Sequence, residues 1–278
     1  MHKMKIPGEF LKKMESLLRQ EEFERFVKSF SQPRAFGLRV NTLKVDVEEF
    51  LRLSPFRLES VPWTKDGFYF EEGESPGKHP YYHAGLYYIQ EPSAMLPGEV
   101  IGAKPGERIL DVCAAPGGKT VQIAARMQGR GILVSNDVNA ERVRALVKNI
   151  ELLGVRNAIV TNETPENLSR NFAGYFDRIL VDAPCSGEGM FRKDPEAVKS
   201  WENYKCEKCA CMQWDILKNL DAMLRPGGVI VYSTCTFAPE ENEQMIAKFL
   251  DEYPGYDIVE IPKTGGISDG RPEWGGGR

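Results

Sequence analysis

One stretch decides the fold expected for this chain, Leu110-Asp111-Val112-Cys113-Ala114-Ala115-Pro116-Gly117-Gly118-Lys119-Thr120. The apolar run that leads into it predicts a buried strand, and the apolar-rich segment after it predicts a helix. A strand that passes through Pro-Gly-Gly into a helix brings backbone N–H groups to a helix N-terminus, where a ligand can bind. The paired glycines let the backbone approach that ligand without intervening Cβ atoms.

Two common nucleotide-binding patterns do not fit this loop. A P-loop would need glycine where Cys113 stands, and a dinucleotide fingerprint needs three spaced glycines, whereas only Gly117 and Gly118 are present. The remaining interpretation is a strand-loop-helix site for a nucleoside cofactor that is not a nucleoside triphosphate. The alternative is a glycine-rich turn that binds no ligand.

Length and composition limit the number of domains, the partners and the cellular location that can be expected for the chain. The chain has 278 residues, enough for one large domain or two smaller ones, and a net charge of −4, which neither supports nor excludes nucleic-acid binding. No apolar run approaches the roughly 20 residues of a membrane span, and no signal-peptide core follows Met1-His2-Lys3-Met4-Lys5. We therefore expect a cytoplasmic protein with no membrane partner, in which the six cysteines are free thiols.

The first part of the chain predicts a small α+β module. Its expected elements are one or two amphipathic helices over 8–30, a strand over 37–41, a helix over 47–53 and a strand over 63–70. A stretch rich in Gly, Pro and Glu at 71–78 suggests a boundary, so that the module covers 1–78 and a second domain covers 79–278. We expect Arg39, Lys44 and Arg57 to be solvated surface. The dense aromatic residues at 81–88 can stack on bases, but packing between the domains is the favoured interpretation.

From Gly106 onward, predicted strands and helices alternate. Strands are expected at 109–112, 131–135, 158–160, 176–181 and 229–232, with a sixth candidate at 256–261; helices are expected at 121–127, 140–153 and 201–224. Such alternation is typical of crossover units and of a parallel sheet covered by helices on both faces. The fold class is therefore α/β.

Polar residues follow five of these strands in turn. The residues concerned are Asp111, Asp137, Asn162-Glu163-Thr164, Asp182-Ala183-Pro184-Cys185 and Ser233-Thr234-Cys235-Thr236. In an open α/β sheet, ligands bind outside the carboxyl ends of the strands, so these residues should meet at one edge. Asp137 can accept both ribose hydroxyls of a nucleoside, although a turn or a helix cap is an equal alternative. Asp182 can hydrogen-bond a base or a cationic group.

The cysteines fall into three groups. Cys185 and Cys235 stand in loops that face the same predicted crevice, where thiolate chemistry is expected, whereas Cys113 is expected to be a buried inert thiol. The group Cys206, Cys209 and Cys211 has thiols close enough to suggest zinc. It lies in a predicted helix with no evident fourth ligand, so no metal is expected.

With these motifs in hand, the chain resembles the Sun-type RNA cytosine-5 methyltransferases, and among them the bacterial RsmF-like ribosomal RNA enzymes. The resemblance rests on residues 111–120, 182–192 and 232–236, and it extends to Arg39-Val40-Asn41-Thr42 and Gln90-Glu91-Pro92-Ser93-Ala94-Met95. It implies a Rossmann-like core that uses S-adenosylmethionine. It also implies an RNA partner, most simply 16S rRNA or the small ribosomal subunit, which the N-terminal module helps to hold, and a monomer.

The resemblance implies a role for each site residue. The cofactor-binding set would be Cys113, Ala114, Ala115, Pro116, Gly117, Gly118, Lys119, Asp137, Arg142, Glu163, Thr164 and Asp182. The catalytic set would be Cys235 as nucleophile, Cys185 assisting breakdown of the adduct, Asp182 at the target base, and Lys119 as a charge beside Asp182 and the thiols. Sequence spacing alone leaves open which cysteine attacks.

The same resemblance implies a chain that is truncated at its C-terminal end. The family core continues to a seventh strand, and RsmF-like enzymes carry a further RNA-binding region, neither of which is visible before Arg278. Competing hypotheses are a transfer-RNA enzyme, a methyltransferase for DNA or a small molecule, and a non-catalytic RNA-binding or ribosome-assembly protein. The paired cysteines disfavour small-molecule O- or N-methylation, which needs no thiol adduct.

Overall fold

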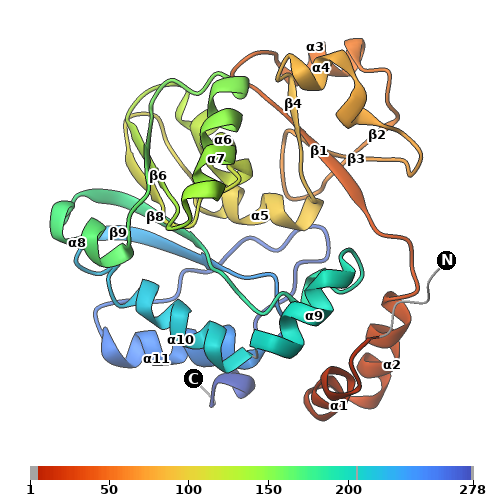
Figure 1. Ribbon diagram of the computed structural model, residues 1–278, viewed down its shortest axis with the longest axis vertical. Helices are drawn as coiled ribbons and strands as arrows, with labels where there is room; N and C mark the ends of the chain where they lie inside the picture. The colour runs from red at the N-terminus through yellow and green to blue at the C-terminus, as the bar shows by residue number, and fades with distance from the viewer. Residues whose placement is uncertain (1–5, 205, 277–278) are drawn as a thin grey trace.

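The computed structural model describes residues 6–204 and 206–276, and its centre is a five-stranded parallel sheet (Figure 1). The strand order is β7-β6-β5-β8-β9. The strands are β5 (Arg108–Asp111), β6 (Ile132–Asn136), β7 (Ala158–Thr161), β8 (Phe176–Asp182) and β9 (Leu224–Ser233). The chain order reverses between β5 and β8, so the ligand crevice of such a sheet is expected outside their carboxyl ends. The Rossmann-like α/β architecture predicted for the core is confirmed.

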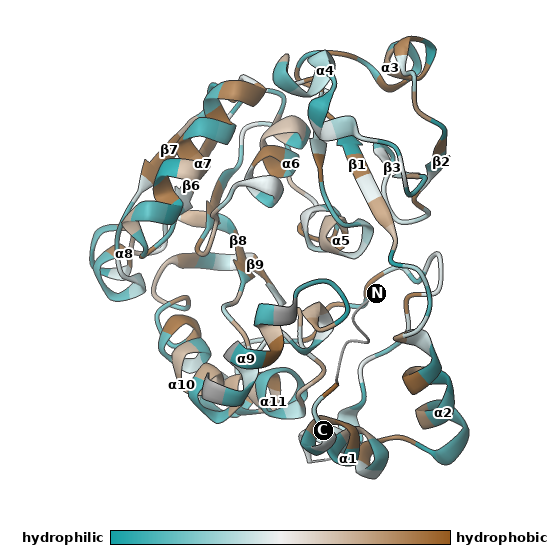
Figure 2. Ribbon diagram, turned by 45° about the vertical axis from the view of Figure 1, so that its right-hand side comes forward, coloured by the Kyte–Doolittle hydropathy of each residue, from teal (hydrophilic) through white to brown (hydrophobic). Residues whose placement is uncertain are grey.

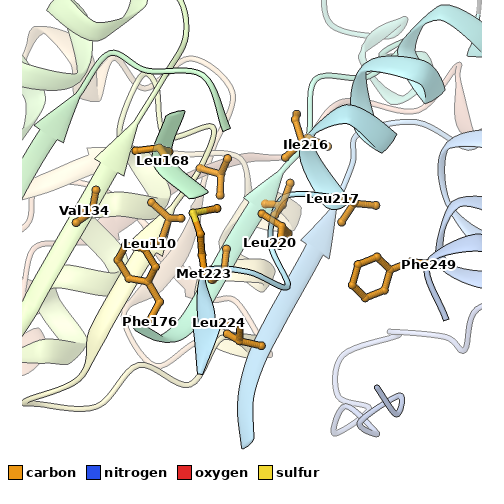
Figure 3. Close-up of a cluster of buried hydrophobic side chains, with 14 of the residues drawn as sticks. Leu110, Val134, Leu168, Phe176, Ile216, Leu217, Leu220, Met223, Leu224 and Phe249 are labelled. Atoms are coloured by element: carbon orange, nitrogen blue, oxygen red, sulfur yellow. The ribbon is translucent and has the colours of Figure 1, made fainter. Parts of the chain in front are cut away.

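Helices cover both faces of this sheet. On one face lie α5 (Pro92–Val100), α6 (Gly118–Met127) and α7 (Ala140–Leu153); on the other lie α8 (Pro165–Asn171), α10 (Cys206–Leu217) and α11 (Glu243–Glu252). Figure 3 shows the second face, where Leu110 and Phe176 of the strands meet Leu217 and Phe249 of the helices. Strands buried on both sides are apolar nearly throughout, which is why the sequence shows runs rather than alternation.

The helices begin where the sequence provides caps. The side chain of Asn139 accepts hydrogen bonds from the backbone N–H groups of Glu141 and Arg142 at the start of α7, and Gly154 (φ 73°) ends that helix. Thr164 caps α8 by accepting from the N–H of Asn167. Caps of this kind satisfy backbone donors that have no partner within the helix.

The N-terminal sheet has the order β2-β3-β1-β4 and is antiparallel. Its elements are β1 (Phe36–Val40), α3 (Val47–Leu53), β2 (Leu58–Ser60), β3 (Gly67–Phe70), α4 (Pro80–His83) and β4 (Tyr87–Ile89). Because β4 pairs with β1, the sheet continues past the boundary predicted at residue 78. Tyr87 is fully buried in its core, so this part of the aromatic segment is packing.

The first two helices stand apart from that sheet (Figures 1 and 2). They are α1 (Gly8–Leu17) and α2 (Gln20–Ser29), and their apolar faces pack on Phe191 and Trp201 of the α/β core. Trp201 belongs to α9 (Pro195–Tyr204). Residues 6–30 therefore form a wall of the core rather than a part of the small sheet.

Arg39 is not solvated surface as predicted. It is 2% exposed, and its guanidinium donates to Gln90 Oε1 and, at 3.1 Å, to Gln122 Oε1 of α6. Arg57 is largely exposed as expected, and Lys44 donates to the backbone oxygens of Ala84 and Leu152. A single buried Arg in a short strand gives no sequence signal that distinguishes it from a surface Arg, because burial depends on partners from distant segments.

Two predicted elements are corrected. The strand expected over 63–70 is shorter and begins at Gly67, with β2 preceding it. The sixth strand expected over 256–261 is absent: this described segment has no strand pairing, and Ile258 and Val259 are 73% and 71% exposed. A β-pattern needs a neighbouring strand to pair with, and β9 pairs only with β8 in the described part of the chain.

Candidate functional site

The polar residues that follow the strands meet at one edge of the sheet, as predicted. In the strand register, Asp111 stands opposite Ser135 on β6 and Leu180 on β8, and Asp182 stands opposite Ser233 on β9. Parallel strands aligned in this way deliver their carboxyl ends to a common crevice.

The loop between β5 and α6 depends on its two glycines. Gly117 has φ of 109°, a left-handed conformation in which side chains are strained, and it caps α6. A Cβ at Gly118 would lie 2.8 Å from the ring of Tyr88 on β4. The second glycine is thus required by the approach of the N-terminal sheet, a reason that the local sequence did not reveal.

Asp111 lies fully buried beneath this loop. Its Oδ2 accepts a 2.7 Å hydrogen bond from Thr120 Oγ1, while its Oδ1 has no hydrogen-bond partner. Burial raises the pKa of Asp111 to about 7. A buried carboxylate oxygen without a partner is uncommon in folded proteins and marks a position where a polar ligand can bind.

Asp137 is also buried, at the end of β6. Its Oδ1 accepts from the N–H of Asn139, and its Oδ2 accepts no hydrogen bond although Arg142 Nη1 lies 3.2 Å away. Asn139, not Asp137, caps α7, and this excludes the helix cap as the role of Asp137. The turn is present, because Asp137 accepts the N–H of Asn139. Arg142 also donates to the backbone oxygen of Ala115, which ties α7 to the loop.

Glu163 and Thr164 are exposed at the end of β7. The Thr164 hydroxyl is engaged in capping α8, and Glu163 Oε2 accepts from Asn167. Sequence reasoning missed Asn136, whose amide nitrogen donates to the backbone oxygens of Val112 and Glu163 and whose oxygen accepts from Thr161 and Glu163. Asn136 thereby holds three strand ends together; its position at the end of a strand was the available signal.

Lys119, Asp182 and Ser233 form a continuous polar chain. Lys119 Nζ donates to Asp182 Oδ2 at 2.5 Å, and Ser233 Oγ donates to Asp182 Oδ1 at 2.8 Å. The Lys119 side chain is 14% exposed, whereas that of Asp182 is 37% exposed and open to the crevice. Lys119 thus lies beside Asp182, the position that the resemblance implied for it.

The two predicted reactive cysteines are in contact. The sulfur atoms of Cys185 and Cys235 lie 3.2 Å apart, and the N–H of Cys235 donates to Cys185 Sγ at 3.3 Å. A hydrogen bond from the Cys185 thiol, helped by the positive charges of Lys119 and Lys193, lowers the pKa of Cys235. The same interaction, together with burial, raises the pKa of Cys185. Because the thiolate is the nucleophile, these two directions favour Cys235 as the attacking thiol of the pair.

This asymmetry predicts the pH dependence of alkylation. Only the thiolate reacts, so a lowered pKa places the midpoint of the Cys235 alkylation rate below its ordinary value of 9.0, and reactivity falls as pH drops through that midpoint. Iodoacetamide labelling followed by peptide mass spectrometry should show Cys235 modified before Cys185 at neutral pH. The exposed Cys211 supplies the internal control. Preferential labelling of Cys185 would contradict the assignment.

Cys113, expected to be a buried inert thiol, is half-buried, and its inertness stays a prediction. Burial and the carboxylates of Asp111, Asp137 and Asp182 raise its pKa. The three cysteines of α10 have different surroundings. Cys206 contacts Lys13 and Glu188, Cys209 is buried and Cys211 is exposed. In the part of the chain that the structure describes, no three metal-ligating side chains gather in a suitable cluster.

A cavity of about 520 Å³ opens beside Cys235. Residues from five parts of the chain line it, among them Phe26, Ser93, Lys119, Asp182, Met190 and Cys235. Its volume lies within the usual range for small-molecule sites. The cavity therefore joins the polar chain, the sulfur of Cys235 and helix α2 in one space.

Glu188 is a residue of this site that sequence reasoning missed. It is fully buried, and its carboxylate accepts from Lys13 Nζ (3.2 Å), Trp201 Nε1 (3.1 Å) and the N–H of Phe237 (3.0 Å). The N–H of the adjacent Gly189 donates to the backbone oxygen of Cys235 at 2.9 Å. Together, these bonds fix the backbone at Cys235 and at Phe237, two residues later. A buried carboxylate needs several donors, and those here come from distant segments.

Comparison with known proteins gives concordant matches. Residues 99–271 match the family model of 16S rRNA methyltransferase RsmB/F, and residues 6–92 match that of the N-terminal domain of 16S rRNA methyltransferase RsmF. Ribosomal RNA small subunit methyltransferase F of Enterobacter sp. (strain 638) is 42% identical over 259 residues, which are 90% of this chain and 54% of the relative. Its counterpart from Vibrio atlanticus (strain LGP32) is 44% identical over 277 residues, 95% of this chain and 57% of the relative.

A solved structure agrees with these matches. The methyltransferase homolog protein from Pyrococcus horikoshii is 33% identical and superposes with a TM-score of 0.72, covering 89% of this chain and 84% of that chain. The chain spans little more than half the length of the curated relatives that it matches. The motifs, the sheet order and the two family models agree, and the chain belongs to the RsmB/F family of 16S rRNA methyltransferases.

Proposed function

We propose that this chain transfers a methyl group from S-adenosylmethionine to carbon-5 of a cytosine in RNA, through a covalent adduct between Cys235 and carbon-6 of the base. One observation carries the proposal: two thiols 3.2 Å apart share a crevice with the Lys119–Asp182 pair. Methyl transfer to oxygen or nitrogen would need no such thiol pair.

The residues at the strand ends fit the cofactor. Asp111 Oδ1 and Asp137 Oδ2 are buried oxygens without hydrogen-bond partners, beside a loop whose Gly117 adopts a left-handed conformation. Residues 113–119 would surround the cofactor, Asp137 and Arg142 would hold its ribose end, and Glu163 or Thr164 would meet the adenine. When bound, S-adenosylmethionine supplies an electrophilic methyl group.

The chain's own residues make the base able to accept that methyl group. Carbon-5 of cytosine is a poor nucleophile until the Cys235 thiolate adds to carbon-6, which converts the ring into an enamine. Lys119 can pass a proton through Asp182 to N3 of the base, which assists this addition. After carbon-5 has gained the methyl group, Cys185 is placed to assist removal of the carbon-5 proton. The carbon–sulfur bond then breaks, the Cys235 thiolate leaves, and the proton on N3 returns through Asp182 to Lys119.

The RNA is most simply 16S rRNA, free or in the small ribosomal subunit. This substrate is supported by the names of the curated relatives, and the N-terminal module, which borders the cavity through α2, would help to hold it. The target cytosine has to leave its stack to reach Cys235. In the described residues, no helix combines the length and the apolar character that a membrane crossing requires.

The proposal is tested by incubating the protein with labelled S-adenosylmethionine and RNA. Separate arms contain 16S rRNA, assembled small subunits, transfer RNA and DNA, and the product is digested to nucleosides. We expect 5-methylcytidine in the 16S rRNA or subunit arm. Label confined to transfer RNA would change the substrate, and cofactor binding without label in any arm would instead favour a non-catalytic RNA-binding role.

A further inference from the structure

The cavity beside Cys235 has an aromatic wall that the methyl-transfer chemistry does not use. The wall consists of Phe26 and Phe30 from α2 and Phe237 from the loop after β9. The rings of Phe26 and Phe237 lie 5.2 Å apart at 89°, and those of Phe26 and Phe30 lie 5.2 Å apart at 82°. These are edge-to-face contacts, in which one ring supports another and leaves a face of the cluster open.

Phe237 is the exposed member of this wall. It is 38% exposed, stands two residues after Cys235 and lines the cavity. Its position is nevertheless fixed, because its N–H donates to the buried Glu188 and its ring contacts the fully buried Phe10 at 6.4 Å. A large apolar ring that is held rigidly and left open to a catalytic cavity is suited to stack on a planar ligand.

Cationic side chains line the same cavity. Arg192 Nη1 donates to the backbone oxygen of Ser29 at the end of α2, and Lys193 pairs with Glu91. Both cations follow the Glu188–Met190 turn, and they face the space that the phenylalanines border. Aromatic rings combined with Arg and Lys form the usual surface for single-stranded nucleic acid, which stacks its bases and places its phosphates near the cations.

We propose that Phe237, supported by Phe26 and Phe30, is a stacking site for the nucleobase next to the target cytosine, with Arg192 and Lys193 beside the intervening phosphate. This inference rests on the proposed function. When one base leaves the stack to reach Cys235, its neighbour loses a stacking partner, and an aromatic ring two residues from the thiol replaces that partner. The N-terminal helices thus contribute to substrate recognition through the wall of the catalytic cavity itself.

The experiment compares steady-state methylation of 16S rRNA by the wild type, Phe237→Leu, Phe237→Tyr and Phe26→Leu. Stacking on one ring is worth enough for about a tenfold change in affinity, so Phe237→Leu should raise KM for RNA about tenfold with kcat within about twofold. Phe237→Tyr keeps the ring and should stay within about twofold of the wild type. Phe36→Leu, on β1 and outside the cavity lining, is the matched control.

Two further measurements separate stacking from a disturbed thiol loop. The iodoacetamide reactivity of Cys235 and the thermal midpoint should match the wild type in Phe237→Leu. If Phe237→Leu is destabilised, Phe26→Leu replaces it in the test, and we expect it to raise KM for RNA by less than the tenfold expected for Phe237→Leu. An unchanged KM in folded Phe237→Leu, or equal effects of Leu and Tyr, would overturn the stacking site while wild-type methylation stands. Absence of methylation by the wild type would instead refute the proposed function.

Discussion

Replacing Cys235 with alanine is expected to abolish both methylation and the covalent complex with RNA. The thiol is exposed to the cavity, and the hydrogen bond from Cys185 lowers its pKa, so it is the sulfur that can attack carbon-6. Loss of a covalent nucleophile commonly lowers turnover by about 10⁴-fold or more. Cys185 is not expected to take over the attack: in Cys235→Ala its hydrogen bond to Cys235 is lost, but burial still raises its pKa, and it is not among the residues that line the cavity.

The covalent complex is measured with 16S rRNA that contains 5-fluorocytidine. The fluorine at carbon-5 cannot leave as a proton, so wild-type protein should remain attached to the RNA in denaturing gels. Cys235→Ala should give no such band, while Cys211→Ala, an exposed cysteine on α10, should match the wild type. A persistent band in Cys235→Ala that disappears in Cys185→Ala would reverse the roles of the two thiols.

The sequence predicted those parts of the site that depend on local order along the chain. Asp111, Asp182 and Cys235 follow apolar runs, and the rule that parallel strands end at a common edge was enough to bring them together. The loop glycines and the Cys185–Cys235 pair could be found in the same way. The order of residues along the chain did not predict the directions in which the pKa values of Cys185 and Cys235 shift. Those directions arise from the contact between the two sulfur atoms, which belong to residues 50 positions apart.

The residues that were missed depend on long-range contacts. Arg39 is buried because Gln90 and Gln122 accept its hydrogen bonds, and Glu188 is buried because Lys13 and Trp201 donate to it. Nothing near Arg39 or Glu188 in the sequence distinguishes them from surface charges. The strand predicted over 256–261 was wrong because a strand also depends on a distant partner. The segment has an apolar pattern, but no described strand pairs with it.

The packing partners of α1 and α2 are another feature that the sequence did not predict. The amphipathic pattern over 8–30 predicted helices but not what they cover, and the structure packs α1 and α2 against Phe191 and Trp201 of the core. Phe26 and Phe30 consequently line the same cavity as Cys235, about 200 positions later in the chain. A module boundary drawn from composition therefore does not separate the residues that line this cavity.

Replacing Cys185 with alanine is expected to trap the enzyme on its RNA. The Cys185 sulfur lies 3.2 Å from that of Cys235, so it is within reach of the adduct formed at carbon-6. After methyl transfer, the carbon-5 proton must be removed before the carbon–sulfur bond can break, and removing a group that assists proton transfer costs about 10²- to 10⁴-fold. Addition and methyl transfer still occur in Cys185→Ala, whereas release becomes slow.

Unmodified 16S rRNA is the substrate for this test, because 5-fluorocytidine would trap the wild type as well. With S-adenosylmethionine present, Cys185→Ala should accumulate a denaturant-resistant complex whose RNA carries 5-methylcytidine, and multiple turnover should cease after about one equivalent. The double variant Cys185→Ala, Cys235→Ala should form no complex, because the trapped bond is the one to Cys235. If Cys185→Ala turns over normally, the proton is removed elsewhere and the polar chain of Asp182 becomes the site to test. The contact between the two sulfurs would then serve only to lower the pKa of Cys235.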